Sequence, residues 1–301
     1  ISISIILNLC LMLAILLTND KKQFKYFKSV LSKFSFENIS TYSTISSSLK
    51  KNEKINFSSE SFNRKSKIME IDEIRKLPII FVGGYGRSGT TLMRAILDVH
   101  PNISCGPETN IVLTFLAYLT KYIGNKSTQK ELHEAGIEIP IVDDAASSFI
   151  YSILKNRKAK EFYNNSLNNE RLCCKDPNIL YHIKYLHKLF PNAKFIHMYR
   201  DGRAAAYSFM LKVRERITFP KFLTYFNSWS SYNELVDEEC AKLGKKYCWQ
   251  VKYEELVQTP EKILKDVVLF LNETWTNELL QHEKHFKDEI KISKLEWSSP
   301  Q

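Results

Sequence analysis

The sequence predicts a three-layer α/β fold in which helices cover both faces of a central parallel sheet. A predicted strand, a loop and a predicted helix follow one another three times, and a glycine-rich loop ends the first predicted strand. Strands that alternate with helices are typical of parallel sheets. Because such sheets bind ligands at the carboxyl ends of their strands, we expect functional residues to follow the strands directly.

The predicted strands are short, largely apolar runs bounded by turn residues, as expected for buried strands. They lie at residues 78–82, 193–199 and 247–252. The helices that follow are expected at residues 90–97 and 202–216, and in stretches that run through Leu280. In the first of these helices, one face carries the apolar residues Leu92, Met93, Ile96 and Leu97.

The length and composition are those of a folded α/β domain with appendages. The chain has 301 residues, of which 44% are hydrophobic and 25% charged, so it can bury a core. A formal net charge of +10 favours anionic partners. The sequence has no zinc-finger spacing, RNP-like aromatic motif or basic heptad region, so nucleic acid is not expected among them.

The N-terminal segment, residues 1–18, contains no charge and is expected to form a signal-anchor transmembrane segment. It is marginal in length, since a span needs about 20 apolar residues. A cleaved signal peptide is the alternative, but no small-x-small cleavage site follows. The positive-inside rule alone would place the next residues in the cytoplasm, because they include Lys21, Lys22, Lys25 and Lys28.

Glycosylation sequons and cysteines favour the secretory lumen for the rest of the chain. Sequons occur at Asn38, Asn56, Asn102, Asn125, Asn164 and Asn272. The cysteines are Cys10, Cys105, Cys173, Cys174, Cys240 and Cys248. They lack the paired spacing of a zinc site, and the short interval from Cys240 to Cys248 suits a disulfide.

The composition changes near Leu77, which divides the chain into a stem and a folded domain. Residues 19–76 are rich in Ser, Lys and Asn without sustained periodicity, so we expect a flexible stem. Residues 77–301 are expected to form the folded domain. Since the sequence begins with Ile1, we expect it to be a fragment of a longer protein.

The loop between the first strand and helix, residues 84–91, is a candidate phosphate-binding loop. Its glycines allow a sharp turn, and the helix N-terminus adds a partial positive charge. The spacing of Gly84 and Gly89 resembles a nucleotide P-loop, but Thr90 stands where that motif has its lysine. This disfavours a kinase or GTPase, and Arg87 offers charge instead. The alternative is an ordinary glycine-rich turn.

Residues 86–95 resemble the loop of sulfotransferases that binds the 5′-phosphosulfate of 3′-phosphoadenylyl sulfate (PAPS). Two segments downstream, residues 97–101 and 105–109, are similar to the tyrosylprotein sulfotransferases in particular. Further matches lie at residues 172–177, 189–195, 200–204, 253–257 and 292–296. The resemblance covers residues 77–297, and because the family extends beyond this point, we expect the C-terminal part of the domain to be missing.

The resemblance implies transfer of a sulfuryl group from PAPS to tyrosine hydroxyls of secretory proteins. Glu108 matches the catalytic base of the family. A base is needed because the pKa of a phenol is near 10. A glutamate that only favours a helix N-terminus is the alternative.

Arg87 and Lys175 would stabilise charge on the sulfuryl and bridging oxygens, although Lys175 could instead be a surface lysine at a strand end. Arg200 resembles part of the 3′-phosphate clamp, because its guanidinium fork can pair with phosphate oxygens. Lys212 stands where the family usually has arginine. The residues implied to bind the donor are Arg87, Ser88, Gly89, Thr90, Thr91, Arg200, Ser208, Lys212, Tyr253 and Ser293.

The resemblance also implies disulfides between Cys105 and Cys173 and between Cys240 and Cys248, with Cys174 left as a thiol. It implies no metal. It places the protein in the Golgi membrane as a single-pass type II protein with a luminal catalytic domain, and it allows a homodimer.

Besides Lys212, three positions on the acceptor side depart from the family. Asn110, Thr114 and Glu131 replace arginines that hold the acidic residues flanking the acceptor tyrosine. The donor motifs are intact, so a sulfotransferase for carbohydrate or another hydroxyl is an alternative. A paralogue that binds nucleotide or peptide without catalysis is another.

Overall fold

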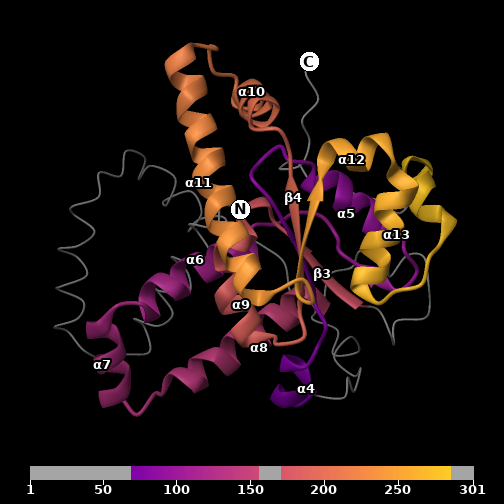
Figure 1. Cartoon of the computed structure of the whole chain (residues 1–301). Coiled ribbons are helices and arrows are strands. Elements are labelled where there is room, and N and C mark those ends of the chain that lie inside the picture. Colours follow the sequence, from indigo (N-terminus) through magenta and orange to yellow (C-terminus); the bar gives the residue numbers. More distant parts are fainter. Residues whose placement is uncertain (1–68, 156–170, 286–301) are drawn as a thin grey trace, which may run out of the picture. The chain divides into compact units, whose positions relative to one another are not determined.

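A computed structural model describes residues 69–155 and 171–285, and these residues contain a five-stranded parallel sheet flanked by helices (Figure 1). The strand order is β2-β3-β1-β4-β5, and every neighbouring pair is parallel. The strands are β1 (Ile80–Gly83), β2 (Ile103–Ser104), β3 (Arg171–Lys175), β4 (Lys194–Tyr199) and β5 (Cys248–Lys252). The predicted fold class is confirmed.

The three predicted strands correspond to β1, β4 and β5, whereas β2 and β3 are additional. The additional strands lack a long apolar run: β2 has only two residues, and β3 reads Arg-Leu-Cys-Cys-Lys. They belong to the sheet because β1 pairs with β3, which in turn pairs with β2. Pairing with neighbouring strands, and not a local sequence pattern, therefore explains why these two segments are strands.

Helices connect all the strands. The α-helices are α4 (Ile71–Arg75), α5 (Thr90–Asp98), α6 (Ile111–Ile123), α7 (Lys126–Glu134), α8 (Ile139–Lys155), α9 (Ile183–Leu189), α10 (Gly202–Lys212), α11 (Phe219–Leu243), α12 (Tyr253–Gln258) and α13 (Pro260–Leu271). Two 3₁₀ helices, η2 (Pro177–His182) and η3 (Asn277–His285), complete the described residues.

The helix predicted at residues 202–216 is wrong at its C-terminal end, because α10 ends at Lys212. Arg214 adopts a left-handed conformation with φ of 55°, which stops the helix. The N–H groups of Arg214 and Glu215 then donate to carbonyls of the last turn, those of Leu211 and Met210.

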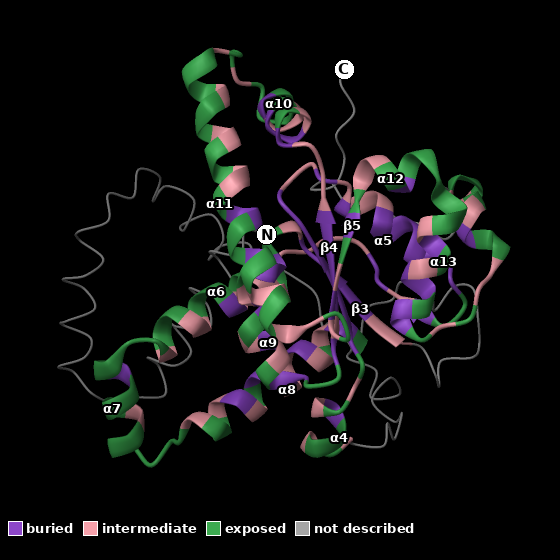
Figure 2. Ribbon diagram, viewed as in Figure 1, coloured by how far each residue is buried: buried purple, intermediate pink, exposed green. Residues whose placement is uncertain are grey.

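The sheet separates two apolar cores, as Figure 2 shows by the buried strands between the helices. Alternate residues of a strand point to opposite faces. Phe81 and Phe195 pack on one face with residues from helices α6, α8, α9 and α11. Ile80 and Val82 pack on the other with residues from α5 and α13. This arrangement gives the three layers.

Helix α4 packs onto the domain although its residues lie within the stretch predicted as a stem. Ile74 is buried, and the Nη1 atom of Arg75 lies 2.9 Å from Oδ1 of Asp144 in α8. Within residues 69–155 and 171–285, none of the helices has the length and apolar character needed to cross a bilayer. The predicted span at residues 1–18 lies outside the described residues.

Both implied disulfides are present in the structure. Cys105 is bonded to Cys173 in β3, and Cys240 at the end of α11 is bonded to Cys248 in β5. Cys174 is buried and forms no disulfide, as expected, and its thiol donates to Oδ2 of Asp176 at 3.8 Å. The first disulfide fastens the segment after β2 to the strand that ends in Lys175.

Candidate active site

The loop from Gly84 to Gly89 runs closely against its neighbours and requires glycine at both ends. A Cβ atom at Gly84 would lie 2.3 Å from the carbonyl oxygen of Met198 in β4. Gly89 has φ of 94°, and a Cβ atom there would lie 2.5 Å from the ring of Tyr253. The two glycines therefore let the chain pass between β4 and α12 without steric overlap.

The loop has the features of an anion-binding turn. It leads into α5, whose N-terminus carries a partial positive charge. The side chain of Ser88 is fully buried, and its Oγ atom has no hydrogen-bond partner among the described residues. Since buried hydroxyls normally form hydrogen bonds, an oxygen of a bound anion would complete this site.

Arg87, Arg200, Ser208 and Tyr253 come together around this loop. The Nε atom of Arg87 donates to Oγ of Ser208 at 3.1 Å, and Arg200 donates to the carbonyl oxygen of Arg87 at 3.0 Å. The guanidinium of Arg200 lies 4.5 Å from the centre of the Tyr253 ring. The fold thus assembles four of the predicted donor-binding residues from separate segments.

The two guanidinium groups are close enough to affect each other. Burial, followed by the positive charge of Arg200, lowers the pKa of Arg87. Within the part of the chain that the structure describes, neither Arg87 nor Arg200 forms an ion pair with a carboxylate. An anion bound between them would relieve this repulsion and favour the charged form of Arg87.

Glu108 and Lys175 form an ion pair beside the start of α5. Their Oε2 and Nζ atoms are 2.6 Å apart, and Nζ also donates to Oγ1 of Thr91 at 3.4 Å. The side chains are 11% and 0% exposed, respectively. Lys175 is therefore not a surface lysine. Glu108 forms an ion pair with it, so its role is not limited to a favourable interaction with a helix N-terminus.

The buried carboxylate of Asp98, which the sequence analysis did not single out, holds the backbone shortly before Glu108. Oδ1 of Asp98 accepts hydrogen bonds from the N–H groups of Cys105 and Gly106, at 2.8 and 3.1 Å. Oδ2 of Asp98 pairs with Arg94, which is fully buried. A charged pair spaced i,i+4 on the apolar face of a predicted helix was the signal in the sequence that could have revealed them.

The remaining predicted residues are placed unevenly. Thr90 is the buried first residue of α5, and Lys212 is the exposed last residue of α10, one turn beyond Ser208. Ser293 lies outside the described residues. Of the positions that depart from the family, Asn110 and Thr114 lie at the start of α6, whereas Glu131 is exposed on α7.

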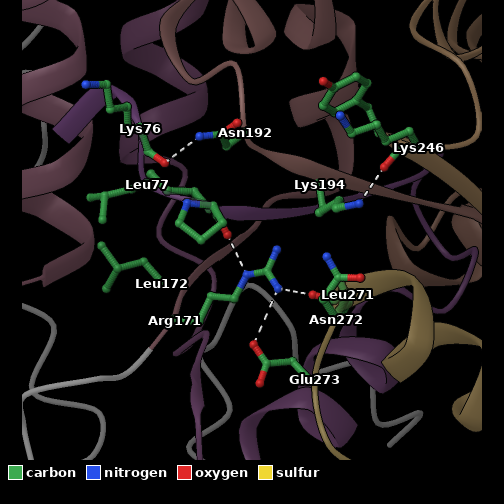
Figure 3. Close-up of a pocket in the computed structure, with 13 residues that line it drawn as sticks. Lys76, Leu77, Arg171, Leu172, Asn192, Lys194, Lys246, Leu271, Asn272 and Glu273 are labelled. Atoms are coloured by element: carbon green, nitrogen blue, oxygen red, sulfur yellow. Dashed lines mark hydrogen bonds and ion pairs between the residues drawn. The ribbon is translucent and has the colours of Figure 1, made fainter. Parts of the chain in front are cut away.

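A separate cleft of about 660 Å³ lies at the opposite edge of the sheet, where the strands begin (Figure 3). Arg171 crosses it, donating to the carbonyl oxygens of Pro78 and Leu271 and pairing with Glu273. None of the predicted site residues lines this cleft. The contacts of Arg171 join the start of β3 to the segment before β1 and to the end of α13, so its role is structural.

Comparisons with known proteins show the family of this chain. Residues 78–277 match a family model described as the sulfotransferase family. Over 75% of its length, the chain is 36% identical to a protein-tyrosine sulfotransferase of Drosophila melanogaster and 35% identical to protein-tyrosine sulfotransferase A of Caenorhabditis elegans. The chain spans 45% and 58% of those two proteins.

The fold resembles that of a solved structure, the sulfotransferase domain of the Synechococcus PCC 7002 olefin synthase. The TM-score is 0.51 at 22% sequence identity, over 69% of this chain and 78% of that one.

The Gly89→Ala variant tests the packing of the loop. Alanine in the left-handed region costs about 1–2 kcal/mol, and overlap with the Tyr253 ring adds about 1–3 kcal/mol. Gly136→Ala is the matched control, because Gly136 also has positive φ, at 74°, but nothing lies within 4 Å of its Cβ position. We expect denaturant unfolding to show a clearly larger loss of stability for Gly89→Ala. Equal losses would contradict the close packing against Tyr253.

Proposed function

Because the chain belongs to the sulfotransferase family, we propose that it transfers a sulfuryl group from PAPS to tyrosine hydroxyls of secretory-pathway proteins. The products would be tyrosine O-sulfate and adenosine 3′,5′-bisphosphate. The observation that carries the proposal is the Glu108–Lys175 pair beside a loop whose arginines lack carboxylate partners among the described residues. The names of the relatives support tyrosine as the acceptor.

The residues around the loop fit a donor that carries phosphate at both the 3′ and the 5′ position of its ribose. Ser88, the N-terminus of α5 and Arg87 would hold the 5′-phosphosulfate. Arg200 and Ser208 would hold the 3′-phosphate, while Tyr253 supports the guanidinium of Arg200. PAPS supplies the sulfuryl group, which moves from a phosphate oxygen to the phenol oxygen.

Glu108 would remove the phenol proton, and Lys175 would stabilise the negative charge that develops during transfer. The carboxylate of Glu108 takes the phenol proton, since a protonated phenol is a poor nucleophile near neutral pH. Lys175 lies within hydrogen-bond distance of both Glu108 and Thr91, so its charge is positioned between the base and the loop. A buried ammonium there stabilises negative charge that develops during transfer.

The Glu108→Gln variant tests the base. We expect kcat for an acidic tyrosine peptide to fall by about 10²–10⁴-fold, with the affinity for adenosine 3′,5′-bisphosphate retained. Radiolabelled PAPS and the full-length protein would be used, with thermal unfolding measured in parallel because Lys175 loses its carboxylate. Glu134→Gln is the control, since Glu134 is an exposed glutamate at the end of α7.

The acceptors in this assay decide between the candidate functions. Label on the tyrosine peptide, and none on its phenylalanine analogue, is the expected result. Label on a glycosaminoglycan alone would reject the tyrosine acceptor and keep the donor site. Nucleotide binding without transfer to any acceptor would indicate a protein that binds but does not catalyse.

The Arg200→Ala variant tests the 3′-phosphate clamp. Loss of a charged hydrogen-bond donor is expected to weaken binding of adenosine 3′,5′-bisphosphate by about 10- to 100-fold. Arg203→Ala is the matched control, because Arg203 lies one turn away on α10, is exposed and pairs with Asp201. Isothermal titration calorimetry gives both affinities, and similar losses in the two variants would reject the specific role of Arg200.

We also propose that the protein resides in the Golgi membrane as a single-pass type II protein with a luminal catalytic domain. Two disulfides support an oxidising compartment. The sequon residues Asn102, Asn125 and Asn272 are exposed. We expect the full-length protein to co-localise with Golgi markers and to shift in mass after glycosidase treatment. A diffuse cytosolic distribution without a shift would reject this placement. The homodimer stays a prediction, to be checked by sedimentation.

A further inference from the structure

The connection between α10 and α11 carries an unusual concentration of exposed apolar and cationic side chains. We call residues 211–221 the hairpin tip. Its exposed apolar residues are Leu211, Val213, Ile217 and Phe219. Its exposed cations are Lys212, Arg214, Arg216 and Lys221. Phe219 is 75% exposed, and exposed apolar surface of this kind is typical of interaction sites.

The charge of the hairpin tip is only partly balanced. Its one acidic residue, Glu215, pairs with Lys221 at 3.2 Å. Neither Arg214 nor Arg216 forms an ion pair with any residue in the described ranges. The tip therefore presents two guanidinium groups to solvent next to apolar side chains, a surface that complements a segment with both acidic and apolar residues.

The base of the hairpin rests on the candidate phosphate loop. Ser208 accepts the hydrogen bond from Arg87, and the hydroxyl of Tyr85 donates to the carbonyl oxygen of Tyr225 in α11. The ring of Phe209 packs 6.0 Å from that of Tyr85. In Figure 1, α10 and the start of α11 extend beyond the carboxyl end of β4, the edge that carries the candidate active site.

The backbone at Arg214 is in a conformation that favours glycine, with φ of 55°. Among the described residues, Arg87 in the phosphate loop is the other arginine with positive φ, at 75°. Residues held in such conformations cluster at functional sites. The left-handed residue after α10 could be a glycine, and an arginine at this position adds a charge that glycine would not.

We propose that the hairpin tip binds the acceptor polypeptide, with Arg214 and Arg216 contacting acidic residues that flank the acceptor tyrosine. Ile217 and Phe219 would pack against an apolar residue of the same segment. The inference rests on the proposed function, and it supplies cations in place of those replaced by Asn110, Thr114 and Glu131. A second copy of this chain is a poorer occupant, because two cationic tips would repel each other.

The test compares Arg214→Gln/Arg216→Gln with a matched control, Lys245→Gln/Lys262→Gln, which removes two exposed cations elsewhere. We expect the arginine variant to raise KM for a tyrosine peptide with acidic flanks by about tenfold, as for the loss of two exposed charge contacts. The kcat value and the KM of a peptide with neutral flanks should stay within about twofold, and high salt should remove the difference. Arg214→Lys/Arg216→Lys should restore most of the affinity.

Binding is measured separately from turnover, by fluorescence anisotropy of the acidic peptide with the full-length protein saturated with adenosine 3′,5′-bisphosphate. Arginine-dependent binding by an enzyme that transfers no sulfate would support the hairpin tip and reject the proposed function. Transfer with unchanged KM and binding in the arginine variant would reject the hairpin tip and keep the function.

Two further measurements test the apolar residues of the hairpin tip and the alternative that the tip binds a membrane surface. Phe219→Ser should weaken the binding of a peptide that carries leucine beside its acidic run more than it weakens the binding of the same peptide with alanine there. Equal effects on the two peptides would reject the apolar contact. Loss of binding to phosphatidylserine vesicles in the arginine variant, with peptide binding unchanged, would assign the tip to a membrane surface and overturn the proposal.

Discussion

The ion pair between Glu108 and Lys175 lies where little water can reach either side chain. Removing one partner of such a pair leaves an uncompensated charge and costs about 3–5 kcal/mol. Each residue of the pair therefore depends on the other for its stability in the buried position. The disulfide between Cys105 and Cys173 joins their segments close to the pair, and Asp98 holds the backbone of Cys105 and Gly106. The surrounding structure thus fixes the position of Glu108.

The carboxyl edge of the sheet gathers positive charge that the described residues only partly neutralise. Lys175 has its carboxylate, whereas Arg87 and Arg200 have none, and burial with mutual repulsion lowers the pKa of Arg87. Such an edge is less stable alone than with an anion bound. The buried hydroxyl of Ser88, without a partner, points to the same conclusion.

The amino and carboxyl ends of the parallel strands differ in how far the protein itself satisfies their polar groups. At the amino edge, Arg171 pairs with Glu273 and donates to two backbone carbonyls, so its charge and its donors are occupied by the protein itself. At the carboxyl edge, glycines, positive-φ arginines and an unpaired buried hydroxyl leave interactions for a ligand. Parallel strands produce this division because all of them begin at one edge and end at the other.

The sequence by itself determined the fold class and three of the strands, because glycine spacing and apolar runs act locally. It also predicted the phosphate loop and the donor residues, whose family motifs are contiguous in the chain. Tertiary structure alone decided that β2 and β3 join the sheet, that Lys175 is buried against Glu108, and that α10 ends at Lys212. It also revealed Asp98, Arg94 and the hairpin tip. These features depend on partners distant in the chain, whose contacts have no local pattern, since burial and pairing are properties of the folded whole.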